Sequence, residues 1–150
     1  MSLNHILVLN PKANLFLIVL VIAGCSANNP QSVAPQSNVA PSGPLPPLPS
    51  GKHAAMIADP NPIKVCDGSG LGVTNIGLTI APPVSVVDVR IDSPDGTQFA
   101  TKGASGFVPT GKWVTDGMVF YLQDITGGKP LTPENTLATV AARVTNVGCP

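Results

Sequence analysis

The sequence predicts an all-β fold for its last part, residues 61–150, as a single small sandwich of about six or seven strands. Two observations predict this fold. Apolar and polar residues alternate with a period of two, which is the spacing of a strand with one buried face. Clusters of glycine, proline and aspartate, which are typical of turns, separate the alternating runs. No stretch of this part carries the apolar period of a helix.

Four alternating runs define the clearest strands, at residues 75–80, 84–92, 118–122 and 138–145. Every second residue in each run is apolar, so one face of the strand can be buried while the other meets solvent. The residues expected to point inward are Ile76, Leu78 and Ile80; Val87, Val89 and Ile91; Met118, Phe120 and Leu122; and Ala138, Val140, Ala142 and Val144.

Three shorter runs are further strand candidates, at residues 63–66, 97–100 and 105–114. The pair Thr132 and Pro133 is typical of a helix start. It predicts no more than one helical turn, because the residues that follow return to a period of two.

The apolar run at residues 15–25 stands apart from this domain. It holds about half of the roughly 20 apolar residues that a membrane-spanning helix needs. Its end, Ile22-Ala23-Gly24-Cys25, resembles the lipobox of bacterial lipoprotein signal peptides. The resemblance implies that residues 1–24 are a cleaved signal peptide and that Cys25 is the lipidated first residue. Diacylglycerol on the thiol and an acyl chain on the amino terminus are enough for stable anchoring in a membrane.

The resemblance also bears on the destination. In such families the residue after the cysteine affects sorting, and Ser26 is not the aspartate that signals retention in the inner membrane. An outer-membrane location is implied if the host has two membranes. Because Lys12 is the only positive charge in the leading region, an uncleaved single-pass anchor and plain secretion remain as alternatives.

Residues 25–60 are expected to form the lipidated cysteine and a disordered tether. Proline, serine, asparagine, glutamine and alanine dominate, so the segment cannot bury enough apolar area to offset its ordering entropy. In extended polyproline II form, at about 3.1 Å per residue, it would hold a domain up to roughly 100 Å from the membrane. The alternative is that Pro44-Leu45-Pro46-Pro47 is a ligand for an aromatic-lined groove.

Residues 110–121 resemble the later strands of immunoglobulin-like domains, where a polar turn containing an aspartate precedes an aromatic strand. Asp116 lies in this turn, but Phe120 takes the usual tyrosine position and Tyr121 comes one residue later. Trp113 lies late in the domain, whereas the immunoglobulin pattern has its core tryptophan early. The resemblance therefore implies an immunoglobulin-like sandwich without membership of a named family.

Lipidation of Cys25 would leave two of the three cysteines, Cys66 and Cys149. An oxidising compartment outside the cytoplasm favours a disulfide between them. Closing a loop of some 80 residues would add roughly 4 kcal/mol of stability. That is a large share of the 5–15 kcal/mol or so of a whole domain. The alternative is two free thiols.

The sequence of the domain contains few side chains or motifs that are typical of a catalytic site. Its sequence contains no histidine, because His5 lies in the signal and His53 in the tether, which removes the commonest general base and metal ligand. The acids lie in turns or at outward strand positions, and the turns at Asp67 and Asp95 lack the ligand count of a calcium site. The basic residues form no run that would favour nucleic acid. We expect no enzyme activity, metal or cofactor, and no nucleic-acid partner.

With catalysis and nucleic-acid binding not expected, recognition of a ligand or partner at the surface is the remaining class of function. If Phe120 points inward, Tyr121 points outward, and Trp113 points outward if Val114 faces the core. Exposed aromatic side chains suit stacking on sugar rings or anchoring a protein partner. The alternative is that Trp113 caps a core that is short of aromatic residues. The candidate binding surface is Lys112, Trp113, Tyr121 and Gln123.

These observations predict a non-catalytic, lipid-anchored envelope protein that displays a β-sandwich for recognition or scaffolding. Its expected partners are the membrane, through the lipid, and envelope proteins or polysaccharide. A structural subunit of an envelope complex, joined through strand edges, is the first alternative. An envelope enzyme acting on polysaccharide is a less favoured one.

Overall fold

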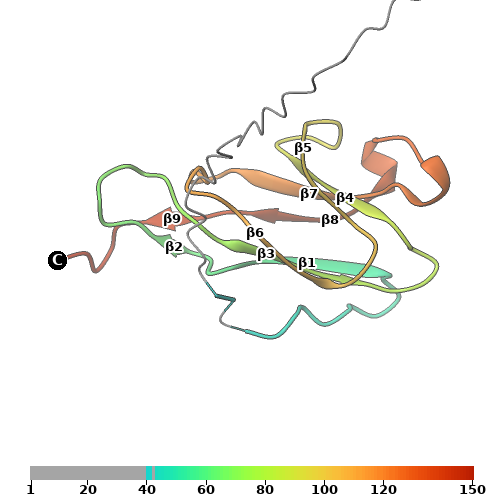
Figure 1. Ribbon diagram of the computed structural model, residues 1–150, viewed down its shortest axis with the longest axis horizontal. Coiled ribbons are helices and arrows are strands. Elements are labelled where there is room, and N and C mark those ends of the chain that lie inside the picture. Colours follow the sequence, from blue (N-terminus) through green and yellow to red (C-terminus); the bar gives the residue numbers. More distant parts are fainter. Residues whose placement is uncertain (1–39, 42) are drawn as a thin grey trace, which may run out of the picture. The chain divides into compact units, whose positions relative to one another are not determined.

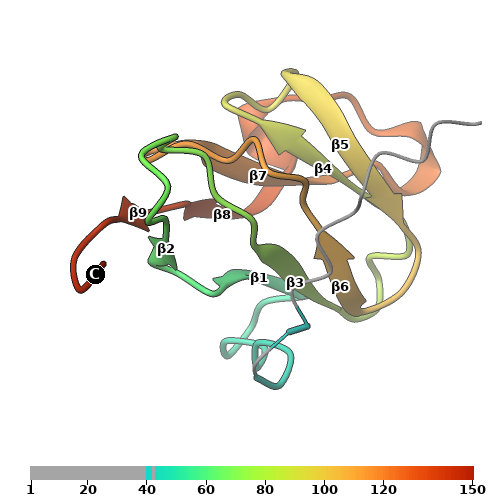
Figure 2. The ribbon, with the colours of Figure 1, turned by 60° about the vertical axis from the view of Figure 1, so that its left-hand side comes forward.

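The computed structural model describes residues 40–41 and 43–150, and this part is all-β, as the period-two pattern predicts. Two sheets face each other as a sandwich (Figures 1 and 2). The first has the order β1-β3-β6 and the second the order β5-β4-β7-β8. The strands are β1 (Ala54–Asp59), β3 (Asn75–Ile80), β4 (Val87–Ile91), β5 (Thr97–Lys102), β6 (Gly106–Pro109), β7 (Val119–Asp124) and β8 (Thr136–Ala141).

The predicted inward residues build the core between the two sheets. Ile76 and Leu78 on β3 and Val87 on β4 are fully buried, as are Phe120 and Leu122 on β7. Adjacent strands in each sheet pair antiparallel, so these residues meet across the sandwich with their polar neighbours on the outer faces. The strands expected at residues 75–80, 84–92 and 118–122 are therefore confirmed, whereas the run at 138–145 is divided between β8 and a separate short strand, β9 (Val144–Thr145).

A third, parallel pair closes one end of the sandwich. β2 (Ile63–Lys64) pairs with β9 (Val144–Thr145), which follows β8. Beyond this pair Cys66 and Cys149 form the predicted disulfide, with an S–S distance of 2.06 Å. The disulfide ties the residues after β9 to the segment that follows β2.

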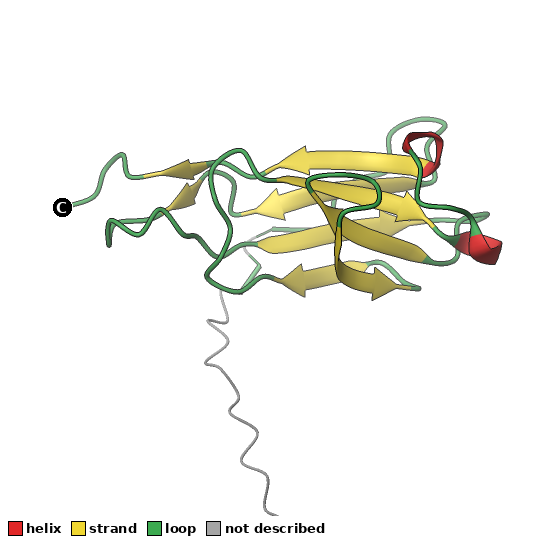
Figure 3. Ribbon diagram, turned by 90° about the horizontal axis from the view of Figure 1, so that it is seen from above, coloured by secondary structure: helices red, strands yellow, loops and turns green. Residues whose placement is uncertain are grey.

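The helical content matches the weak helix signal. The 3-10 turn η2 (Pro133–Asn135) lies at the predicted position, and a second turn, η1 (Thr126–Gly128), precedes it. Both lie in the connection between β7 and β8 (Figure 3). No helix in the described residues is long and apolar enough to cross a membrane.

The expectation that the disordered tether reaches residue 60 is wrong at its end. β1 (Ala54–Asp59) pairs with β3 along its whole length, from Ala54 opposite Ile80 to Asp59 opposite Asn75. Its three alanines, Ala54, Ala55 and Ala58, carry a weak apolar signal in the sequence but are buried in the fold. The folded domain therefore begins before Ala54. The expected signal peptide and Cys25 lie outside the described residues.

The proline-rich segment before β1 also belongs to the domain. Pro46 is buried, and its carbonyl oxygen accepts a hydrogen bond from the Thr79 hydroxyl on β3. The backbone N–H of Gly43 donates to Asp59 Oδ2 at 3.1 Å. The segment thus lies along the outer side of the three-stranded sheet (Figures 1 and 2).

Candidate functional site

The structure divides the candidate binding surface between several parts of the domain. Trp113 is half-buried, and its ring meets that of Phe99 edge-on at a centroid distance of 5.5 Å. The ring of Phe120, which faces the core, lies 6.2 Å from it. Trp113 therefore caps the core, which is the alternative to a place in an exposed patch.

Lys112 forms an ion pair with Asp67. Asp67 also accepts hydrogen bonds from the Ser69 hydroxyl at 2.6 Å and the Ser69 N–H at 3.0 Å. The hydrogen bond from Lys112, followed by those from Ser69, holds the pKa of Asp67 well below its usual range. The pair fastens two loops together.

Tyr121 and Gln123 lie together on the outer face of the four-stranded sheet. Arg90 on β4 stands opposite Tyr121, and Asp88 stands opposite Gln123. Directly opposed residues of an antiparallel pair point to the same face. Because Phe120 and its neighbours fill the core, this second set faces outward.

A polar network covers this outer face. An Asp88 oxygen and an Arg90 nitrogen form an ion pair at 2.5 Å, and the other Asp88 oxygen accepts from the Thr101 hydroxyl. Gln98 donates to Thr101 at 2.7 Å, and Arg90 donates to the Gly96 carbonyl at 3.2 Å. Asp88 is only 4% exposed, so this charge depends on its partners for solvation.

The expectation that Gln123 lies at the surface is wrong, because the residue is fully buried. Its amide nitrogen donates to the Thr136 hydroxyl on β8. Among the described residues, Gln123 Oε1 and Arg90 Nε are buried without a hydrogen-bond partner. Of the four residues of the predicted surface, Lys112 is exposed, and Trp113 and Tyr121 are partly exposed. They form no single patch, because Lys112 pairs with Asp67 and Trp113 packs on Phe99, whereas Tyr121 lies on the outer face of the four-stranded sheet.

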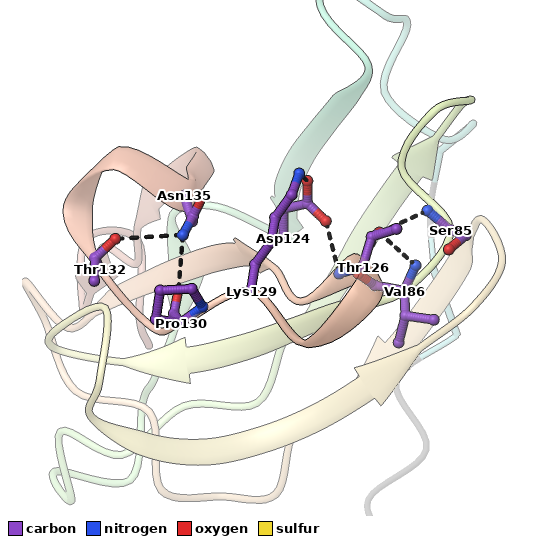
Figure 4. Close-up of polar contacts among 8 residues, drawn as sticks. All are labelled: Ser85, Val86, Asp124, Thr126, Lys129, Pro130, Thr132 and Asn135. Atoms are coloured by element: carbon purple, nitrogen blue, oxygen red, sulfur yellow. Dashed lines mark hydrogen bonds and ion pairs between the residues drawn. The ribbon is translucent and has the colours of Figure 1, made fainter.

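A second polar cluster joins the segment before β4 to the loop after β7 (Figure 4). The Thr126 hydroxyl accepts from the N–H groups of Ser85 at 3.0 Å and Val86 at 3.2 Å. Asp124 accepts from the N–H of Thr126 at 2.9 Å and forms an ion pair with Lys129. Burial raises the pKa of Asp124, but the hydrogen bonds from Lys129 and Thr126 outweigh it and leave the pKa below its ordinary value. These hydrogen bonds and the ion pair hold the two segments together, so the cluster has a structural role.

An apolar groove that the sequence did not predict lies beside β2. Its volume is about 670 Å³. Leu71, which is 37% exposed, forms part of its wall, and the Asp67–Lys112 ion pair lies at its edge. In the sequence, the one sign of this groove is an apolar residue, Leu71, between two glycines in a polar turn. That pattern does not indicate that β2 lies on the other side of the groove. The groove is lined by Pro60, Pro62, Ile63, Lys64, Val65, Cys66, Asp67, Leu71, Gly72, Val73 and Lys112.

No group of three or more histidine, cysteine, aspartate or glutamate residues in the described part of the chain is placed to hold a metal ion. Comparison with protein-family models, curated proteins and solved structures finds no match to this chain.

Proposed function

We propose that this protein is a non-catalytic lipoprotein of the cell envelope that displays a β-sandwich for recognition or scaffolding. One observation carries the proposal. The chain has three cysteines, and the bond between Cys66 and Cys149 uses two of them. The third, Cys25, follows an apolar run and the small residues Ala23 and Gly24, as in a lipobox.

The disulfide itself supports export, because such bonds persist in oxidising compartments. The strand order supports the immunoglobulin-like class within the sandwich architecture. The first, second and fifth long strands (β1, β3 and β6) share one sheet, as strands A, B and E do in that class. The third, sixth and seventh (β4, β7 and β8) share the other, as C, F and G do.

The outer face of the four-stranded sheet is the best candidate for recognition. Tyr121 lies there between Arg90 and Thr139, its neighbours across the two adjoining strands. A phenol ring beside a guanidinium group and hydroxyls can stack on a sugar ring and bond its hydroxyls. Polysaccharide is thus the first ligand to test, ahead of an envelope protein.

The experiment for the anchor is the intact mass of the mature protein from the membrane fraction, before and after reduction. We expect a chain that begins at Cys25, carries acyl mass and gains two hydrogens on reduction. A chain that retains residues 1–24 and carries no acyl mass would overturn the lipoprotein proposal.

The experiment for recognition compares Tyr121→Ala with Thr115→Ala in binding to isolated envelope polysaccharide. Thr115 is an exposed residue outside the sheet and serves as the control. We expect Tyr121→Ala to weaken binding about tenfold, the equivalent of about 1.4 kcal/mol, while Thr115→Ala binds as the unchanged chain does. Equal binding by all three would exclude this face as the site.

A further inference from the structure

An outer row of side chains, Gln98, Arg90, Tyr121 and Thr139, crosses the outer face of the four-stranded sheet. Arg90 on β4 stands opposite Gln98 on β5 and opposite Tyr121 on β7. Tyr121 in turn stands opposite Thr139 on β8. Directly opposed residues of antiparallel strands point to the same face, and neighbouring strands lie about 4.7–4.9 Å apart. The outer row therefore spans roughly 14 Å, which is enough to contact more than one ring of a sugar chain.

The neighbouring row on the same face is covered, and its members bond to one another. Asp88 stands opposite Thr101 on β5 and Gln123 on β7, and Gln123 stands opposite Thr136 on β8. The Thr101 hydroxyl donates to Asp88, and the Gln123 amide donates to the Thr136 hydroxyl. Asp88 is 4% exposed and Gln123 is fully buried. A ligand on this face therefore meets the outer row, and the covered row supports it from the side.

The outer row offers a ligand uncharged groups and one ion whose charge is compensated. Gln98 and Thr139 are exposed, and Tyr121 is half-buried. The ion is Arg90, whose side chain is 15% exposed and pairs with Asp88. A ligand therefore meets an amide, a phenol and a hydroxyl, all of which can bond to hydroxyl groups. The guanidinium is already engaged by its carboxylate and by the Gly96 carbonyl of the turn between β4 and β5.

The charges around the outer row disfavour an anionic ligand. Asp92 and Asp95, which are both exposed, lie in the turn that the Arg90 guanidinium reaches. Lys102 at the end of β5 stands opposite the core residue Val87 and so belongs to the other face of the sheet. An anionic polymer would meet the carboxylates at one end of the row. It would also have to draw Arg90 from its buried carboxylate partner, which would leave that charge uncompensated.

We propose that the outer row binds an uncharged polysaccharide that lies across the four strands. One sugar ring stacks on the Tyr121 phenol, and hydroxyls of the neighbouring units bond to the Gln98 amide and the Thr139 hydroxyl. Such a ligand gains hydrogen bonds without competing for the ion pair of Arg90. Recognition of polysaccharide is the proposed function on which this binding mode rests. The charge of the ligand and its direction across the strands go beyond that function.

The experiment separates isolated envelope polysaccharide into an uncharged and an anionic fraction by ion exchange and titrates the full chain with each. We expect the uncharged fraction to bind with the same affinity in about 0.05 M and about 0.5 M NaCl, because the complex contains no ion pair with the ligand for salt to screen. The anionic fraction should bind about tenfold more weakly or not at all.

Variants along the outer row test the direction of the ligand. Tyr121→Phe keeps the ring and should bind nearly as well as the unchanged chain. Gln98→Ala and Thr139→Ala should each weaken binding about threefold to tenfold, as expected for the loss of one hydrogen bond. Thr97→Ala is the matched control, because Thr97 is exposed on the same sheet but stands opposite Ile91, which packs on the core. Urea unfolding of each variant checks that it is folded.

The outcomes separate the binding mode from the proposed function. Binding to the anionic fraction alone that depends on Tyr121 would overturn the binding mode and leave recognition of polysaccharide in place. Unchanged affinity in both Gln98→Ala and Thr139→Ala would overturn the direction across the strands. Binding that ignores Tyr121→Ala, or no binding of either fraction, would overturn recognition at this face and the binding mode with it.

Discussion

At the scale of single residues, burial decides which side chains can act. Tyr121 and Gln123 are two positions apart on one face, yet Gln123 is fully buried and Tyr121 is partly accessible. Alternation predicts the face of each residue correctly, but neighbouring strands and loops decide how much of that face meets solvent. Trp113 is a further example, because its ring turns toward Phe99 and the core.

The position of Trp113 predicts a stability defect. Trp113→Ala removes the ring packed on Phe99 and Phe120, and a half-buried aromatic ring of this size contributes about 2–3 kcal/mol. We expect the free energy of unfolding in urea to fall by that amount. Lys112→Ala, the adjacent residue in a half-exposed ion pair, should change it by less than about 1 kcal/mol. If the Trp113→Ala chain is as stable as the unchanged one, the ring does not contribute to the core and is available as part of a binding surface.

Asp124 predicts a dependence on pH. Its pKa is lower in the folded chain than in the unfolded one, so its contribution is complete above the unfolded pKa of about 3.9. It is lost as the pH falls from there through the folded pKa. Asp124→Asn cannot titrate, and its Tm should fall less between pH 6 and pH 2.5 than that of the unchanged chain. Parallel curves for the two proteins would contradict the role of this carboxylate.

At the scale of elements, β3 organises the first sheet because both of its faces are covered. Its inward residues fill the core, and on its outer face Gly77 lies against Ile57 and Phe107. A Cβ at Gly77 would lie 2.7 Å from Phe107 Cε1. The sequence predicts β3 from its alternation, but the covering of its outer face depends on β1, β6 and the proline-rich segment together.

Gly77→Ala tests this packing. The added methyl must displace Phe107 and Ile57, and we expect a loss of about 1–3 kcal/mol in unfolding free energy. Gly103→Ala is the matched control, because its nearest neighbour, the Ser85 carbonyl oxygen, would lie 3.5 Å from the new methyl. Its effect should stay below about 0.5 kcal/mol. Equal effects at both glycines would show that the outer face is loosely packed.

At the scale of the whole molecule, the disulfide joins the last residues of the domain to the segment that follows β2. Cys66 and Cys149 are separated by 83 positions, so their bond closes the part of the domain from β3 to β9 into a loop. It also holds the last residues beside β2, where Lys64 donates to the Gly148 carbonyl. A small sandwich with few aromatic residues gains much from such a link, because its core area is limited.

Removing the disulfide should therefore lower stability strongly. We expect Cys66→Ser with Cys149→Ser to lose roughly 4 kcal/mol, since the unfolded chain regains the entropy of an open loop. Urea unfolding of the double variant and of the oxidised chain measures the difference. Adding reductant should destabilise only the oxidised chain. A double variant of unchanged stability would mean that the β2–β9 pair holds this end without the bond.

The sequence by itself determined the all-β class and the inward residues of the main strands. It predicted the Cys66–Cys149 disulfide on the expectation that Cys25 is lipidated, and the structure shows the bond. Periodicity and turn chemistry are local properties, so they can be read from neighbouring residues in the sequence. Only the tertiary structure decided that Ala54–Asp59 is a strand, that Gln123 is buried and that a groove lies beside β2. Each depends on residues far away in sequence: an alanine-rich strand is fixed by its partner, and a groove exists only between two segments. The local pattern of apolar and polar residues does not identify such distant neighbours.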